Sequence, residues 1–113
     1  MSQPSEAWID ALPIGDLPAG ATAEVVVGEE IIALVNSGGA IYALDGVCAH
    51  QGGPLGKAAV SHDGGRCVLT CPWHGWQYDA ASGEQLLSDT IRQRVFATRV
   101  VDDTIQVRFE RAP

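Results

Sequence analysis

The sequence is short of basic residues and of long hydrophobic runs, and both shortages exclude classes of function. Its 7 lysines and arginines stand against 14 aspartates and glutamates, a net charge of −7 that argues against nucleic acid or an anionic membrane surface as a partner. The longest uninterrupted apolar stretch, residues 31–35, is far below the roughly 20 residues needed to cross a bilayer. Residues 1–6 lack the basic and apolar segments of an export signal, so we expect a cytoplasmic protein.

Cysteine is also scarce, and the motifs of common enzyme sites are missing. Three cysteines form an odd number in a chain without an export signal, which is a poor disulfide framework and favours metal binding or catalysis. The sequence contains no dinucleotide-binding fingerprint, no nucleophile beside a base and no mononuclear-iron triad. We therefore expect a protein that does not itself catalyse a reaction.

The sequence has the length of one domain, 113 residues, and its apolar residues form short β-branched runs separated by turn residues. We predict an all-β fold, an antiparallel sandwich or small barrel, and we expect residues 46–65 to form a loop. Val100, Ile105 and Val107 are predicted core residues. The predicted strands are Ala23–Val27, Ile31–Asn36, Ala40–Leu44, Arg66–Thr70, Trp76–Asp79, Phe96–Val101 and Thr104–Phe109.

Two of the cysteines and two of the three histidines form matched pairs. Cys48 is followed at the second position by His50, and Cys71 at the third by His74, with twenty residues between the pairs. A thiolate and an imidazole from each of two loops make a four-ligand metal site. Tetrahedral zinc would accept this set, although zinc modules usually present a Cys–Cys and a His–His pair. The alternating order fits a binuclear iron centre better, with both thiolates on one iron and both imidazoles on the other.

These pairs resemble the two boxes of the Rieske family, as Cys-Ala-His-Gln-Gly-Gly-Pro-Leu (48–55) and Cys-Pro-Trp-His-Gly-Trp (71–76). The resemblance extends to residues 31–34 and 41–44 and covers most of the chain. It implies one Rieske domain over residues 1–113, in which a sheet base carries a loop-rich cluster-binding subdomain at approximately residues 46–80. It also implies one [2Fe-2S] cluster bound by Cys48, His50, Cys71 and His74. Two ferric ions, two sulfides and two thiolates sum to zero charge, so the cluster accepts an electron more readily than a four-cysteine one.

The resemblance further implies a carrier that passes single electrons from a flavin-dependent reductase to a terminal oxygenase. The extra loop cysteines of cytochrome bc-type Rieske proteins are replaced by Gly53 and Trp73, which favours the soluble ferredoxin type. Trp76 stands where those proteins often have a serine, which predicts a potential in the lower half of the Rieske range. A small Rieske subunit of a nitrite reductase, working with a large reductase subunit, is the alternative. A zinc-stapled structural module ranks below it.

The remaining chemistry-bearing residues receive structural interpretations. Alternation places Cys67 on the same face as Leu69 and Cys71, so Cys67 is predicted to be a small buried hydrophobic residue. His62 is predicted to be a solvated loop residue. Trp76 and Tyr78 share a face and are expected to pack beneath the ligand loops, whereas Trp73 either shields the cluster or contributes to docking.

Overall fold

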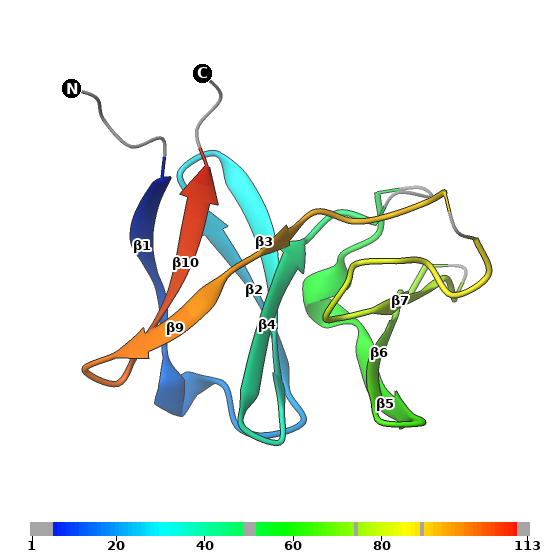
Figure 1. Ribbon diagram of the computed structural model, residues 1–113, viewed down its shortest axis with the longest axis horizontal. Coiled ribbons are helices and arrows are strands. Elements are labelled where there is room, and N and C mark those ends of the chain that lie inside the picture. The colour runs from blue at the N-terminus through cyan, green and yellow to red at the C-terminus, as the bar shows by residue number, and fades with distance from the viewer. Residues whose placement is uncertain (1–5, 49–51, 74, 89, 111–113) are drawn as a thin grey trace.

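The computed structural model describes residues 6–48, 52–73, 75–88 and 90–110, which form three antiparallel sheets (Figure 1). The first sheet has the order β1-β10-β9, the second β2-β3-β4-β8 and the third β5-β6-β7. No helix in these residues is long and apolar enough to span a membrane. The elements are β1 (Glu6–Pro13), the 3₁₀ turn η1 (Ile14–Asp16), β2 (Thr22–Val27), β3 (Glu30–Ser37), β4 (Ala40–Asp45), the 3₁₀ turn η2 (Leu55–Lys57), β5 (Ala59–Asp63), β6 (Arg66–Thr70), β7 (Gln77–Asp79), β8 (Val95–Phe96), β9 (Thr98–Val101) and β10 (Thr104–Glu110).

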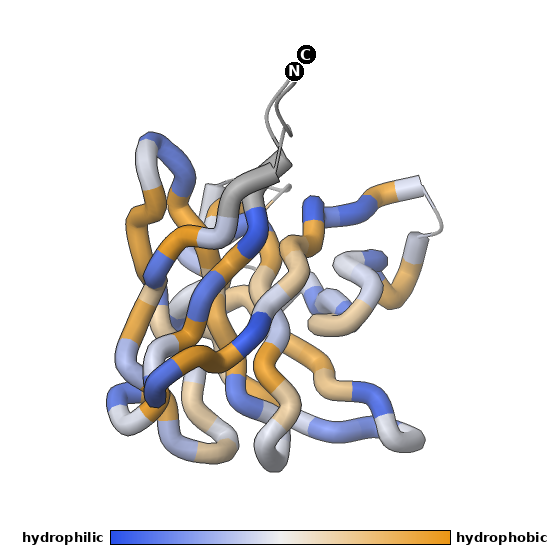
Figure 2. The backbone as a smooth tube through the Cα atoms, turned by 60° about the vertical axis from the view of Figure 1, so that its left-hand side comes forward, coloured by the Kyte–Doolittle hydropathy of each residue, from blue (hydrophilic) through white to orange (hydrophobic). Residues whose placement is uncertain are grey.

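The first two sheets form a base, and the segment from residue 46 to residue 93 forms a lobe beside it (Figure 1). Hydrophobic and hydrophilic residues alternate along strands of the base (Figure 2), as expected for strands with one buried face. In β10, Ile105 and Val107 are fully buried while Gln106 between them is not. The predicted all-β fold of antiparallel sheets is therefore confirmed, and so are Ile105 and Val107 as core residues.

Strand β3 lies between the base and the lobe and packs against both. Its residues from Ile32 to Asn36 are all buried, because both faces of the strand are covered. Ile32 and Leu34 point into the base core with Leu17, whereas Ala33 and Val35 join a second core inside the lobe. The β1-β10-β9 sheet and the lobe thus lie on opposite faces of the central sheet.

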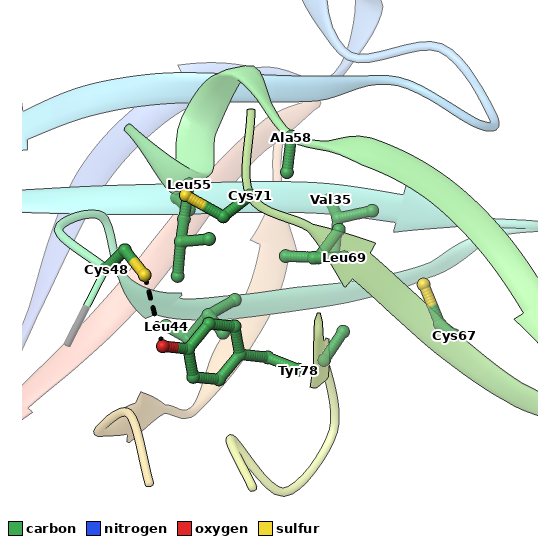
Figure 3. Packing of buried hydrophobic residues seen from close by; sticks show 11 residues of the cluster. Val35, Leu44, Cys48, Leu55, Ala58, Cys67, Leu69, Cys71 and Tyr78 are labelled. Carbon is green, nitrogen blue, oxygen red and sulfur yellow. Dashed lines mark hydrogen bonds between the residues drawn. The ribbon is translucent and has the colours of Figure 1, made fainter. Parts of the chain in front are cut away.

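The lobe core gathers side chains from both sides of this boundary (Figure 3). Ala33, Val35 and Leu44 come from the base, and Leu55, Leu69 and the ring of Tyr78 come from the lobe. All three cysteines are buried in the same core. The loops that begin at Cys48 and Cys71 are consequently anchored on a packed hydrophobic surface that continues directly into the central sheet.

Three predictions about the strands and the core are wrong, and one strand was missed. Residues 46–65 contain β5, which the sequence hides because Ala59–Asp63 is mostly exposed and lacks alternation. Strand β1 was not predicted, since its register shifts between Asp10 and Leu12 and breaks the pattern. The predicted strand over Phe96–Val101 is divided at Ala97, where the chain leaves β4 and joins β10. Val100 is 48% exposed, because β9 lies at the edge of its sheet.

Candidate metal centre

Two cysteine sulfurs meet at the end of the lobe core. Cys48 follows β4 in the first loop, Cys71 follows β6 directly, and both are buried, with exposed fractions of 3% and 1%. Their sulfur atoms lie at one end of the core, whereas Cys67 lies at the other (Figure 3). Burial raises the pKa of the Cys71 thiol, and the neighbouring Cys48 sulfur raises this pKa further, whereas a backbone hydrogen bond at Trp73 lowers it. Two adjacent, buried thiols that form no disulfide are a donor set that suits a soft metal centre.

Each cysteine begins a loop that closes on itself. In the first loop, the Cys48 amide donates to the Gly53 carbonyl at 2.8 Å, and the Gly52 amide donates to the Cys48 carbonyl at 3.0 Å. In the second, the Cys71 amide donates to the Trp76 carbonyl at 2.8 Å. These bonds set the direction in which each cysteine leaves the backbone.

The two loops touch at Gly53. A Cβ atom at this position would lie 2.6 Å from Cys71 Sγ and 3.0 Å from the Cβ of Trp73, closer than van der Waals contact allows. Glycine is therefore required for the first loop to pack against the second cysteine. This close approach supports the prediction that the two loops form one site, and the residues present fit a shared metal group.

Tyr78 contacts the site from within the lobe core. Its ring is fully buried, and a hydrogen bond of 3.2 Å joins its hydroxyl to Cys48 Sγ (Figure 3). A metal-bound thiolate has no proton, so in a loaded site the tyrosine hydroxyl must be the donor. The sequence predicted that Tyr78 and Trp76 pack beneath the loops, and both contact the lobe core. The hydrogen bond itself was not predicted, because it joins residues thirty positions apart.

Cys67 and His62 lie away from this site. Cys67 is 6% exposed and shares the core with Leu69 and Cys71, which confirms its predicted burial. Burial raises the pKa of the Cys67 thiol, while a hydrogen bond from Ser37 lowers it and Asp79 raises it. His62 is exposed as predicted, but it lies in β5 rather than in a loop, and its Nε2 is 2.8 Å from Ser37 Oγ.

The predicted histidine ligands His50 and His74 lie outside the described residues, as do Ala49 and Gln51. Within the part of the chain that the structure describes, no group of three or more metal-binding side chains is assembled. The geometry therefore bears on the two thiols of the predicted set. Trp73, beside His74 in sequence, is 51% exposed, and its role in shielding or docking stays a prediction.

The model of the Rieske [2Fe-2S] domain matches residues 7–99, most of the chain. The chain belongs to this family. It is 30% identical over 104 residues to the ferredoxin component of the naphthalene 1,2-dioxygenase/salicylate 5-hydroxylase systems of Ralstonia sp., covering 91% of this chain and 96% of that protein. It is 28% identical over 106 residues to the ferredoxin component of the alkene monooxygenase system of Xanthobacter autotrophicus, covering 94% and 84% respectively.

Solved Rieske-type structures share the fold. The putative NADH-dependent nitrite reductase small subunit from Mycobacterium tuberculosis superposes with a TM-score of 0.87 at 22% identity, covering 95% of this chain and 98% of that one. A ferredoxin in complex with the oxygenase of carbazole 1,9a-dioxygenase gives 0.78 at 25% identity, covering 94% and 96%. The family confirms the predicted Rieske [2Fe-2S] cofactor, with Cys and His ligands, over the zinc alternative. The ferredoxin relatives confirm the prediction of an electron-transfer protein.

Proposed function

We propose that this Rieske protein carries single electrons from a flavin-dependent reductase to a terminal oxygenase. The observation that carries the proposal is the proximity of Cys48 and Cys71 at the end of the lobe core. It is supported by two similar ferredoxin components, of which the chain covers 84% and 96%. The cluster, when bound, supplies a one-electron redox couple. With all four ligand positions filled by protein, no open position is left for a substrate.

We assign Cys48 and Cys71 to one iron and His50 and His74 to the other. The role of the chain is to hold the two thiolates at a fixed separation, exclude water from them and donate a hydrogen bond to one. Burial of both cysteines supports the second task, and the 3.2 Å contact of Tyr78 supports the third. Hydrogen bonds to ligating sulfurs stabilise negative charge and so favour the reduced state.

We place the cluster-binding subdomain at approximately residues 46–80 of a single domain. The β5-β6-β7 sheet and both cysteine loops lie in this range. The segment after it is tied to the same sheet, because the Leu86 amide donates to the Gln77 carbonyl at 3.0 Å and the Asp79 amide to the Glu84 carbonyl at 2.9 Å. Residues 81–88 and 90–93 therefore cover the subdomain and return the chain to the base.

The alternative is a small subunit of a nitrite reductase. A solved structure described as such a subunit shares the fold with this chain at 22% sequence identity. The partner protein distinguishes the two functions. Affinity-tagged protein should retain a flavin-dependent reductase and an oxygenase subunit from extracts of the source cells. Retention of a large reductase subunit would instead establish the alternative.

The cofactor is tested on the same purified protein. We expect a coloured protein with two irons and two acid-labile sulfides per chain, as a [2Fe-2S] cluster requires. An anaerobic titration should then take up one electron per chain. A colourless protein with one zinc and no labile sulfide would refute the proposed function.

A further inference from the structure

Gln93 is a buried polar side chain in the segment that returns from the lobe to the base. It is 3% exposed, and its Nε2 donates to the Val47 carbonyl at 2.6 Å and to the Asp45 carbonyl at 3.3 Å. Both carbonyls belong to the stretch where the chain leaves the base for the first ligand loop. The side-chain amide of Gln93 thus joins the segment that enters the lobe to the segment that leaves it. Gln93 is 48 residues from Asp45 and 46 residues from Val47 in sequence.

The hydrogen bond to Val47 acts on the peptide unit that precedes the first cysteine. The carbonyl of the Val47–Cys48 peptide accepts from Gln93, and the amide of the same peptide donates to the Gly53 carbonyl at 2.8 Å. Because a peptide unit is planar, fixing both ends fixes its orientation. The Cys48 carbonyl is also held, by the Gly52 amide at 3.0 Å, so both peptide planes beside the Cys48 Cα are constrained. Together they set the direction of the Cys48 side chain, and with it the 3.2 Å contact to Tyr78.

Gln93 is itself held in place on both sides. Its backbone amide donates to the Gly83 carbonyl at 2.8 Å. A Cβ at Gly83, where φ is +80°, would overlap the backbone carbonyl of Gln93. The next residue, Arg94, binds the Asp45 carboxylate through Nε and Nη2 and reaches Glu30 at 2.6 Å. The Asp45 amide also donates to the Arg94 carbonyl at 2.9 Å. Because the backbone at Gln93 is held in this way, its side chain can fix the position of the Val47 carbonyl.

We propose that Gln93 is a positioning residue for the first ligand loop, acting through the Val47 carbonyl on the orientation of Cys48. This inference rests on the proposed function, in which Cys48 binds the cluster. It assigns to the segment that returns from the lobe to the base a task beyond covering the site, which is to orient one of the proposed ligands.

The test compares Gln93→Met with Gln77→Met in the cluster-loaded protein. Both changes remove an amide from a side chain of similar length, but Gln77 is exposed and its Nε2 donates to Thr70 Oγ1. In Gln93→Met, amide exchange over residues 46–56 should become about tenfold faster, because the Asp45 and Val47 carbonyls lose their donor. Exchange in the β2–β3 hairpin should stay as in the unmodified protein. The reduction potential should fall in Gln93→Met and stay unchanged in Gln77→Met.

Two results would overturn the proposal. Exchange over residues 46–56 that is unchanged would show that Gln93 does not hold the loop. An equal acceleration in the β2–β3 hairpin would show a general role in stability. A colourless protein would refute the proposed function, yet the exchange pattern would still test the contact of Gln93 with the loop.

A second variant serves if Gln93→Met does not fold. Gln93→Glu places a carboxylate oxygen against two carbonyls at pH 8. Burial against these carbonyls raises the pKa of the new side chain above its usual value of about 4.3, so at pH 5 the protonated acid donates to one of them. Relative to unmodified protein at the same pH, exchange over residues 46–56 should be faster at pH 8 and restored towards normal at pH 5. Equal acceleration at both pH values, or failure of both variants to fold while Gln77→Met folds, would rule against a positioning role.

Discussion

The three cysteines of this chain share one hydrophobic core but differ in their neighbours. Cys48 and Cys71 lie beside one another at the loops, and Cys67 lies at the far end of the core near Ser37 and Asp79. Burial alone therefore does not distinguish a ligand from a packing residue. What distinguishes Cys48 and Cys71, the proposed ligands, is the second sulfur beside each of them and the loop that each begins.

This difference predicts opposite outcomes for two serine substitutions. Cys71→Ser should lose the cluster, because a hydroxyl is a poor substitute for a thiolate on iron. Cys67→Ser should retain it, with some loss of stability from burying a hydroxyl. Visible absorbance and iron content measure both. A cluster that is absent from Cys67→Ser but present in Cys71→Ser would reverse the assignment.

Tyr78 provides a second prediction at the residue scale. Tyr78→Phe removes the hydroxyl that lies 3.2 Å from Cys48 Sγ. One hydrogen bond contributes about 1 kcal/mol, which corresponds to about 40 mV for a one-electron couple, so the potential should fall by that order. Protein-film voltammetry measures it, and Tyr42→Phe is the control, since Tyr42 packs against the same core. Equal shifts in the two variants would contradict the assignment.

Cys67 also makes stability depend on alkaline pH. Burial raises the pKa of its thiol in the folded protein, so above about pH 8.5 the unfolded chain ionises first. The stability is thus present in full below that pH and is lost as the pH rises through the folded pKa. Cys67→Ala removes this loss, which amounts to at most about 1.4 kcal/mol per pH unit. Between pH 8 and pH 10, the urea midpoint of the unmodified protein should therefore fall further than that of Cys67→Ala. An equal fall of the two midpoints would refute the effect.

At the scale of elements, the sequence predicted what depends on local pattern. Strands with regular alternation can be recognised from a few neighbouring residues. The same holds for the two Cys–His pairs, Cys48 with His50 and Cys71 with His74. Strand β5 is different, because Ala59–Asp63 becomes a strand through its pairing with β6 rather than through its own residues. The contacts of Tyr78 with Cys48 and of Gln93 with Val47 join distant segments, so no local pattern announces them.

The packing of the two loops predicts the effect of a single methyl group. In Gly53→Ala the new Cβ would lie 2.6 Å from Cys71 Sγ, so one loop must move. Overpacking of this kind costs about 1–3 kcal/mol, and we expect fewer clusters per chain. Gly15→Ala is the control, because nothing lies within 4 Å of a Cβ there. Iron content distinguishes them, and normal loading of Gly53→Ala would show that the loops are not packed as described.

The whole molecule combines a strong net charge with paired cations. The net charge is −7, and Arg66, Arg92 and Arg94 each lie in an ion pair with a carboxylate. Three of the seven basic side chains are thus neutralised locally, and the net charge makes the long-range field negative. Such a field attracts cationic reactants and repels anionic ones, over a distance that salt shortens.

Small redox probes test this field without a protein partner. Oxidation of the reduced protein by a cationic cobalt(III) chelate should slow several-fold as ionic strength rises from about 0.01 M to about 0.15 M. Oxidation by anionic ferricyanide should accelerate over the same range. Two rates with the same salt dependence would show that the charge near the cluster differs in sign or size from that of the whole chain.

The pairing of the outermost strands has a consequence for how this domain can be joined to others. Glu6 in β1 lies opposite Glu110 in β10, so the first and last residues that the structure describes lie at one corner. That corner belongs to the sheet that packs on the face of the central sheet opposite the lobe. A host polypeptide can therefore be interrupted by this domain through two adjacent connections, with the cysteine loops left unobstructed. Tethered in this way, a carrier exchanges diffusion for a local concentration in the millimolar range, and the length of the tether becomes a control on the rate of electron delivery.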